Sequence, residues 1–129
     1  SDSPTFVQTH FWIGKYCVPG RLDSEWKGTV EWSCLTGDAQ LAGIWLRLYA
    51  REKDRRYLDG AKRLLSFFKA SQNCIPQNIG LRGGIKGSFP FDGEYGRLEV
   101  LNWATKFFVD ALLLDEQVGG LADSQGVKR

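Results

Sequence analysis

The sequence predicts an all-α fold built from antiparallel helical hairpins. Two observations carry this prediction: long segments with apolar residues at helical spacing, and the order in which those segments follow one another. Segments that are apolar around most of their circumference, and so expected to be buried, flank a segment with a single apolar stripe. Such alternation of inner and outer helices is typical of hairpins arranged around an axis or stacked in an array.

Length and charge limit the class of protein. The 129 residues fit one domain with a sizeable core. With 17 basic and 15 acidic residues, the formal net charge of +2 is too balanced to indicate a nucleic-acid partner. The sequence contains no run of 18 apolar residues, so it does not predict a membrane span. It also lacks a basic start followed by an apolar run, so it does not predict a signal peptide. Because methionine is absent even at position 1, we expect a processed chain or a piece of a longer protein.

The cysteines predict no metal site. Cys17, Cys34 and Cys74 lack CxxC spacing, and His10 is the one histidine that accompanies them. We expect no cofactor, and we expect buried free thiols and a cytoplasmic location, although one disulfide stays open. A catalytic role for His10 lacks a recognisable motif. Cys34 precedes a helix whose positive end lowers thiol pKa values, but a small buried residue is the preferred interpretation.

The first well-marked helix is predicted from Asp38 to about Glu52, with Thr36 or Asp38 as its N-cap. Its apolar residues cover almost the whole circumference, so we expect burial on most sides; they are Ala39, Leu41, Ala42, Ile44, Trp45, Leu46, Leu48 and Tyr49. Residues 1–35 are harder to interpret. A helix starting at Ser3-Pro4 is weakly favoured over a strand, and residues 20–35 are expected to form an irregular loop.

Two further helices are predicted. The segment from Asp54 to about Ser71 has one apolar stripe, typical of a surface helix: Tyr57, Leu58, Ala61, Leu64, Leu65 and Phe68. The short connection before it implies an antiparallel hairpin. A loop from Gln72 to about Arg97 then leads to a buried helix from Leu98 to about Gln117, which Gly119-Gly120 is expected to stop before a frayed tail.

Three motifs resemble those of (α/α) toroids in the six-hairpin glycosidase-like superfamily, particularly uncharacterised proteins associated with polysaccharide metabolism. Ser33-Cys34-Leu35-Thr36-Gly37-Asp38-Ala39-Gln40-Leu41-Ala42 resembles the start of an inner helix. Asp54-Arg55-Arg56-Tyr57-Leu58-Asp59-Gly60-Ala61 resembles its outer partner. Gly83-Gly84-Ile85-Lys86-Gly87-Ser88, followed by Asn102-Trp103-Ala104-Thr105-Lys106-Phe107-Phe108, resembles the next inner helix and its preceding loop. The match covers roughly residues 30–118.

The resemblance implies an incomplete toroid, because a full one needs about twelve helices. The chain looks like the C-terminal part of a longer toroid, whose loops before the inner helices surround a ligand funnel. It also implies a module that binds or processes a glycan. Two alternatives stay open. One is a non-catalytic scaffold that contacts proteins or forms homo-oligomers. The other is a terpenoid-cyclase-like toroid, although this sequence lacks the acid clusters DxDD and DDxxD that such enzymes use.

The candidate site lies in the long loop and the helix behind it. Asp92 and Glu94 are candidates for the acid and base of glycoside cleavage, or else solvated loop acids. Tyr95 and Trp103 are candidate platforms for a sugar ring, or else core packing. The glycines of the loop favour a tight turn over a phosphate cradle, because neither GxxxxGK[ST] nor GxGxxG is present. Beside them, Arg82 and Lys86 are candidates to meet an acidic sugar.

Overall fold

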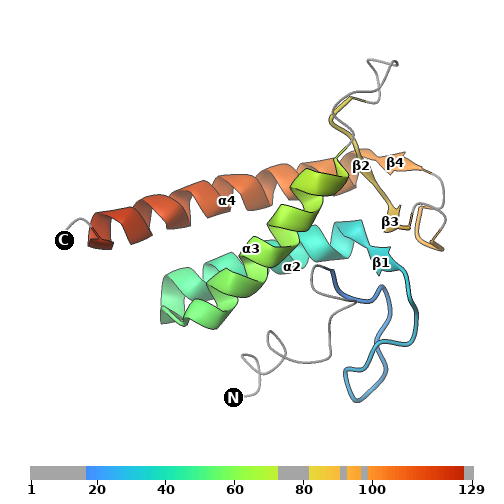
Figure 1. The fold of residues 1–129 in the computed structure, drawn as a ribbon, viewed down its shortest axis with the longest axis horizontal. Coiled ribbons are helices and arrows are strands. Elements are labelled where there is room, and N and C mark those ends of the chain that lie inside the picture. The colour runs from blue at the N-terminus through green and yellow to red at the C-terminus, as the bar shows by residue number, and fades with distance from the viewer. Residues whose placement is uncertain (1–16, 73–81, 91–92, 97–98, 127–129) are drawn as a thin grey trace.

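The computed structural model describes residues 17–72, 82–90, 93–96 and 99–126. Within them, three helices pack together and short strands pair into two-stranded sheets (Figure 1). The helices are α2 (Leu35–Glu52), α3 (Arg55–Ser71) and α4 (Asn102–Gly126). The strands are β1 (Ser33–Cys34), β2 (Ile85–Lys86), β3 (Ser88–Phe89) and β4 (Val100–Leu101). The predicted helical fold is therefore confirmed at the level of a mostly helical small domain.

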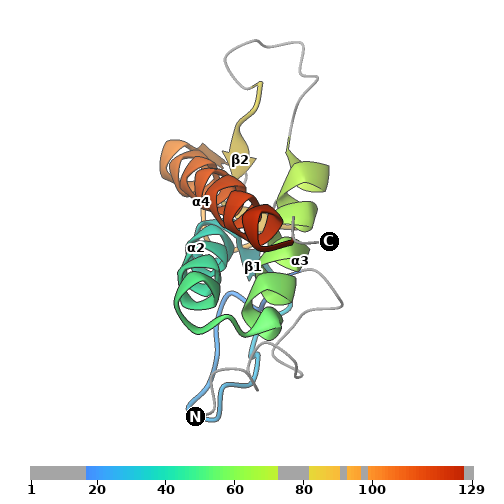
Figure 2. The same ribbon diagram turned by 90° about the vertical axis from the view of Figure 1, so that its left-hand side faces the viewer.

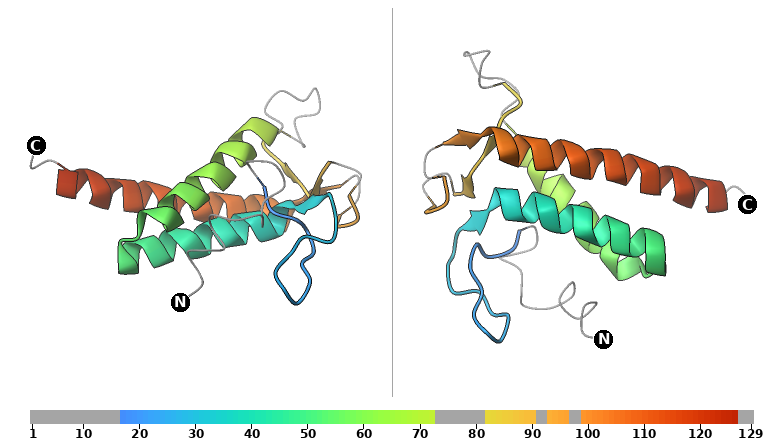
Figure 3. Two further views of the ribbon diagram at one scale, coloured as in Figure 1. Left: turned by 60° about the horizontal axis from the view of Figure 1, so that its bottom comes forward. Right: turned by 180° about the vertical axis from the view of Figure 1, so that it is seen from behind.

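Helices α2 and α4 lie side by side and run in the same direction, each starting at the end of the molecule that carries the strands (Figure 3). Helix α3 runs the opposite way and packs against them from one side (Figure 2). The predicted hairpin of the first two helices is confirmed. The order along the chain is thus one helix of a parallel pair, an antiparallel covering helix, and then the second helix of the pair.

The core lies where these three helices meet. The whole predicted stripe of α3 is buried there, which confirms that helix as an amphipathic surface helix. Facing it are buried side chains of both parallel helices: Leu35, Ala39, Ala42, Trp45 and Leu46 of α2, and Ala104, Phe108, Ala111 and Val118 of α4. Phe68 and Phe108 stack with their ring centroids 5.0 Å apart, which joins α3 directly to α4.

Helix α2 begins three residues earlier than predicted, and the predicted caps are wrong. Its N-cap is Cys34, which makes no side-chain capping bond. Thr36 and Asp38 lie inside the first turn and are buried, and the Asp38 carboxyl contacts the Ser33 hydroxyl rather than a helix amide. The start of α2 is therefore fixed by packing and by β1, which pairs with a strand far away in the sequence. A local capping pattern contains no information about such pairing.

The capping of α3 is as predicted. Asp54 is its N-cap, and Oδ1 of Asp54 accepts a hydrogen bond from the Arg56 amide at 3.0 Å. The turn before it places Lys53 in the left-handed region with φ of 59°, and the Lys53 amide donates to the carbonyl of Tyr49 at 2.8 Å. The tight reversal follows from these two residues.

The long loop contains strands that the sequence did not predict. In the two antiparallel pairs, Ser33 lies opposite Phe89 and Ile85 opposite Leu101. Between β2 and β3, the Gly87 amide donates to the Glu99 carbonyl at 3.0 Å, and the Gly87 carbonyl accepts from the Leu35 amide at 3.0 Å. Gly87 thereby links the segments that lead into α2 and α4, which supports the tight-turn interpretation of the glycines.

Helix α4 differs from its prediction at both ends. It begins at Asn102 rather than Leu98, because Val100 and Leu101 pair with β2 instead. It continues through Gly119-Gly120 to Gly126, so the predicted stop is wrong. A glycine inside a helix costs about 1 kcal/mol without forbidding the helical conformation, so two glycines after a long helix need not end it.

The predicted burial of the two parallel helices on most sides is wrong in part. Ile44 of α2 is 52% exposed, and Val109 and Leu113 of α4 are 46% and 54% exposed. Helix α3 covers one face of the pair, and within the described residues these positions face away from it. The expectations for residues 1–16 and for Cys74 lie outside the described residues. None of the described helices is long and apolar enough to cross a membrane.

Candidate functional site

Two of the predicted site residues come together as an exposed aromatic pair. The indole Nε1–H of Trp103 donates a hydrogen bond of 2.9 Å to the hydroxyl oxygen of Tyr95. The pair sits where the long loop meets the first turn of α4, and Tyr95 is 36% and Trp103 48% exposed. Both side chains therefore keep part of their surface in solvent rather than being fully buried in the core.

The loop that carries Tyr95 is held in place by its own backbone. The carbonyl of Tyr95 accepts a 2.5 Å hydrogen bond from the Ser88 hydroxyl, and Ser88 is fully buried. Gly87 lies so close to this segment that a Cβ on it would stand 2.6 Å from the Tyr95 carbonyl oxygen and 2.9 Å from Gly96. Because Tyr95 is fixed at both its carbonyl and its hydroxyl, the aromatic pair is preorganised rather than loosely attached.

The two candidate acids are placed differently. Glu94 forms an ion pair with Arg21, with 2.8 Å between Oε2 and Nη2, and both side chains are about 60% exposed (60% for Arg21 and 62% for Glu94). Exposed pairs of this kind contribute little to stability. Asp92 lies outside the described residues, so the separation of the two carboxylates stays a prediction.

The candidate basic residues do not join the aromatic pair. Arg82 lines a separate cavity of about 540 Å³ at the start of α4, which Asn102 and Thr105 also face. Thr105 is fully used there, because its hydroxyl accepts from the Ile85 amide at 3.0 Å and donates to the Leu101 carbonyl at 3.1 Å. Lys86 stands on β2 opposite Val100 and is half-buried.

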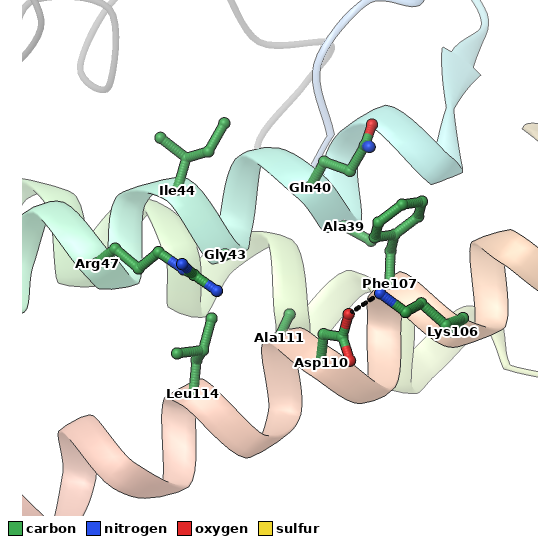
Figure 4. A pocket seen from close by; sticks show the side chains of 10 residues that line it. All are labelled: Ala39, Gln40, Gly43, Ile44, Arg47, Lys106, Phe107, Asp110, Ala111 and Leu114. Carbon is green, nitrogen blue, oxygen red and sulfur yellow. Dashed lines mark ion pairs between the residues drawn. The ribbon is translucent and has the colours of Figure 1, made fainter.

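A groove that the sequence did not predict runs between α2 and α4 (Figure 4). We call it the α2–α4 groove; it has a volume of about 390 Å³ and is lined by Ala39, Gln40, Gly43, Ile44 and Arg47 of α2 and by Lys106, Phe107, Asp110, Ala111 and Leu114 of α4. Lys106 and Asp110 pair at 2.6 Å, and the Lys106 ammonium stands 4.7 Å from the centroid of the Phe107 ring. The sequence signal for this groove was limited to the spacing of Gln40 and Arg47, which places both residues on one face of α2.

A buried polar cluster lies at the start of α2. The Ser33 hydroxyl is 2.6 Å from the Val18 carbonyl and 2.5 Å from Oδ2 of Asp38. The Ser33 hydroxyl lies within donating distance of both oxygens but has one proton, so it can donate fully to only one of them at a time; when Asp38 is protonated, its carboxyl can donate to Ser33 while Ser33 donates to Val18. Burial raises the pKa of Asp38 to about 8, although the hydrogen bonds from Ser33 and from the Val18 backbone oppose this rise. At pH 7 burial thus favours the protonated carboxyl of Asp38.

Neither of the two described cysteines, Cys17 and Cys34, is in a disulfide. Burial raises the pKa of Cys17 to about 11, with a further contribution from Asp38. Burial also raises the pKa of Cys34, and the amides of Gly37 and Thr36 at the helix start only partly oppose this. Neither thiol is activated as a nucleophile. The described part of the chain contains no group of three or more His, Cys, Asp or Glu side chains that could hold a metal ion.

Comparisons of the chain with protein-family models, with curated proteins and with solved structures found no match.

Proposed function

We propose that this chain is part of an (α/α) toroid and that it binds a glycan at the Tyr95–Trp103 pair. The observation that carries the proposal is the exposure of these two rings, linked edge to edge by the 2.9 Å hydrogen bond. The flat apolar face of a pyranose stacks on an aromatic ring, while the surrounding polar groups meet its hydroxyls. A rigid aromatic surface beside a polar loop fits this chemistry.

The arrangement of the helices supports the toroid part of the proposal. A toroid alternates inner and outer helices, so its inner helices run parallel and begin at the same end. Helices α2 and α4 have this relation, with α3 antiparallel and on one side (Figure 3). The aromatic pair lies at the end where α2 and α4 both begin, which is where the resemblance to six-hairpin proteins puts the ligand funnel.

A glycan-array screen tests the binding function. We expect the intact chain to bind a defined set of glycans, and Trp103→Ala to weaken that binding about tenfold, or roughly 1.4 kcal/mol. Trp26→Ala is the matched control, because Trp26 is 54% exposed but belongs to the turn between Leu22 and Gly28. Absence of binding by the intact chain, or equal loss in both variants, would overturn the proposal.

Glycan cleavage by Asp92 and Glu94 is a separate prediction. Two carboxyl groups must stand about 5–5.5 Å apart for a retaining mechanism and about 6.5–9.5 Å apart for an inverting one. A reducing-end assay on the glycans that bind, with the intact chain and Glu94→Gln, tests it. If Glu94 is catalytic, the intact chain should release sugar and Glu94→Gln should not. Equal rates of sugar release by the two proteins would exclude Glu94 from the reaction.

Exposed apolar side chains on α4 favour a second candidate function, that of a scaffold that binds another polypeptide chain. Val109 and Leu113 lie four residues apart, one helical turn, and both are about half-exposed. Such a strip suits the missing remainder of a toroid or a second copy of this chain. Native mass spectrometry distinguishes these, because a stable monomer at micromolar concentration would argue against self-association.

A further inference from the structure

The α2–α4 groove has the size and the mixed lining of a ligand site. Its volume of about 390 Å³ falls in the usual range for small-molecule sites, roughly 300–1,000 Å³. Small residues, Ala39 and Gly43 on one helix and Ala111 on the other, leave the space open between the two backbones. Larger side chains rise on both sides of it, and Figure 4 shows Arg47 projecting from α2 into the space between the helices.

Some charged side chains of the groove are paired with an opposite charge and one is not. Asp110 is already held by Lys106 at 2.6 Å, so this pair is close to neutral. Within the described ranges, no acidic side chain pairs with Arg47, which leaves the charge of its guanidinium unbalanced at the groove. A guanidinium binds a carboxylate through two parallel hydrogen bonds, and this geometry is stronger and more specific than a single charged contact.

The groove continues the face of α4 that carries Trp103. Trp103 precedes Phe107 by four residues and Leu114 by eleven, spacings that keep all three on one side of the helix. At 1.5 Å per residue, Trp103 and Leu114 are about 16 Å apart along the axis. Trp103 itself does not line the groove, so a ligand that stacks on Trp103 must be longer than one sugar unit to reach Phe107 and Arg47.

We propose that the α2–α4 groove binds an acidic oligosaccharide, with a uronate carboxylate on Arg47 and a sugar face on Phe107. The Gln40 amide and the Asp110 carboxylate are placed to bond hydroxyl groups along the same path. This inference rests on the proposed glycan-binding function, and it specifies which class of glycan is bound. It also assigns the acid recognition to Arg47, which lines this groove, whereas Arg82 lines the separate cavity at the start of α4.

Isothermal titration with two probes tests the proposal: tetragalacturonic acid and the same tetrasaccharide with its carboxyls methyl-esterified. We expect the acid to bind at least about tenfold more tightly than the ester, and its affinity to fall as salt screens the charges. Arg47→Gln should remove this preference. Arg55→Gln is the control, because Arg55 is also exposed but lies on α3, where it pairs with Asp59 at 3.7 Å.

The outcomes separate this inference from the function it rests on. Equal affinity for acid and ester, with binding still sensitive to Trp103→Ala, leaves the glycan function intact and overturns the role of Arg47. An unchanged preference in Arg47→Gln overturns it as well. If neither these probes nor any glycan on an array binds the intact chain, both the inference and the function fail. A concentration-dependent dimer blocked by Arg47→Gln would assign the groove to a second copy of this chain instead.

Discussion

The buried carboxyl of Asp38 makes the stability of this protein depend on pH. An unfolded Asp has a pKa near 3.9, whereas burial raises the pKa of Asp38 to about 8 in the folded chain. Between these values the folded state holds a proton that the unfolded chain has released, so the free energy of unfolding falls as pH rises. The free energy of unfolding is highest below the pKa that Asp38 has in the unfolded chain. The whole contribution of Asp38 is lost above the pKa that it has in the folded chain.

The magnitude follows from the width of that window. Each pH unit inside it removes up to about 1.4 kcal/mol of stability, so the change from pH 5 to pH 7 is about 3 kcal/mol. Asp38→Asn abolishes the ionisation, and the side-chain amide of Asn can still form a hydrogen bond with the Ser33 hydroxyl, which contacts Oδ2 of Asp38 in the wild type. The variant should therefore resemble the wild type below about pH 4, and its advantage in unfolding free energy should grow by about 3 kcal/mol from pH 5 to pH 7.

Urea unfolding followed by tryptophan fluorescence measures this directly. The difference in unfolding free energy between wild type and Asp38→Asn at each pH cancels the titration of all other groups that the two proteins share. Cys17 does not interfere, because its pKa of about 11 leaves the thiol neutral throughout. A difference that stays constant from pH 5 to pH 8, or that moves in favour of the wild type as pH rises, would refute a neutral Asp38.

Three other changes have expected results. Gly87→Ala should destabilise the fold by roughly 1–3 kcal/mol in urea unfolding, because its Cβ would meet the Tyr95 carbonyl, whereas Gly119→Ala, with open space around it, should be neutral or stabilising; equal effects would contradict the close approach. Asp54→Ala should cost about 1 kcal/mol by the same measurement through loss of the α3 cap, and an unchanged midpoint would show that the cap is not needed. The Cys34 thiol, whose pKa is raised, should react with iodoacetamide at pH 7 more slowly than free cysteine, and a faster reaction would contradict its burial.

The sequence predicted α3 well because its information is local. The Asp54 cap and the apolar stripe both lie within the helix, and the structure has each where the pattern indicated. The ends of α2 and α4 were predicted less well, because strands from distant parts of the chain pair in front of them. Val100 could be assigned to β4 rather than to the helix only by knowing that it lies opposite Lys86.

The candidate site was predictable by residue type but not by geometry. Tyr95 and Trp103 stood out as aromatic residues around the loop, yet their hydrogen bond depends on how the loop folds against α4. The α2–α4 groove needed the relative placement of two helices, which no pattern within either helix contains. Arg47 was therefore missed, although it shares a helix face with Gln40. The burial of Asp38 was hidden for the same reason, because Ser33 and Val18 approach it from outside the helix.

The central claim is that a glycan binds on the Tyr95–Trp103 pair, and the indole N–H signal of Trp103 in a ¹⁵N-edited NMR spectrum reports on it most directly. The signal is assigned from its loss in Trp103→Ala. Titration with tetragalacturonic acid should shift this signal progressively and saturably, with little change in the signal of Trp26. Saturable shifts confined to other indoles, or no shift with this or any array-positive glycan, would contradict the claim.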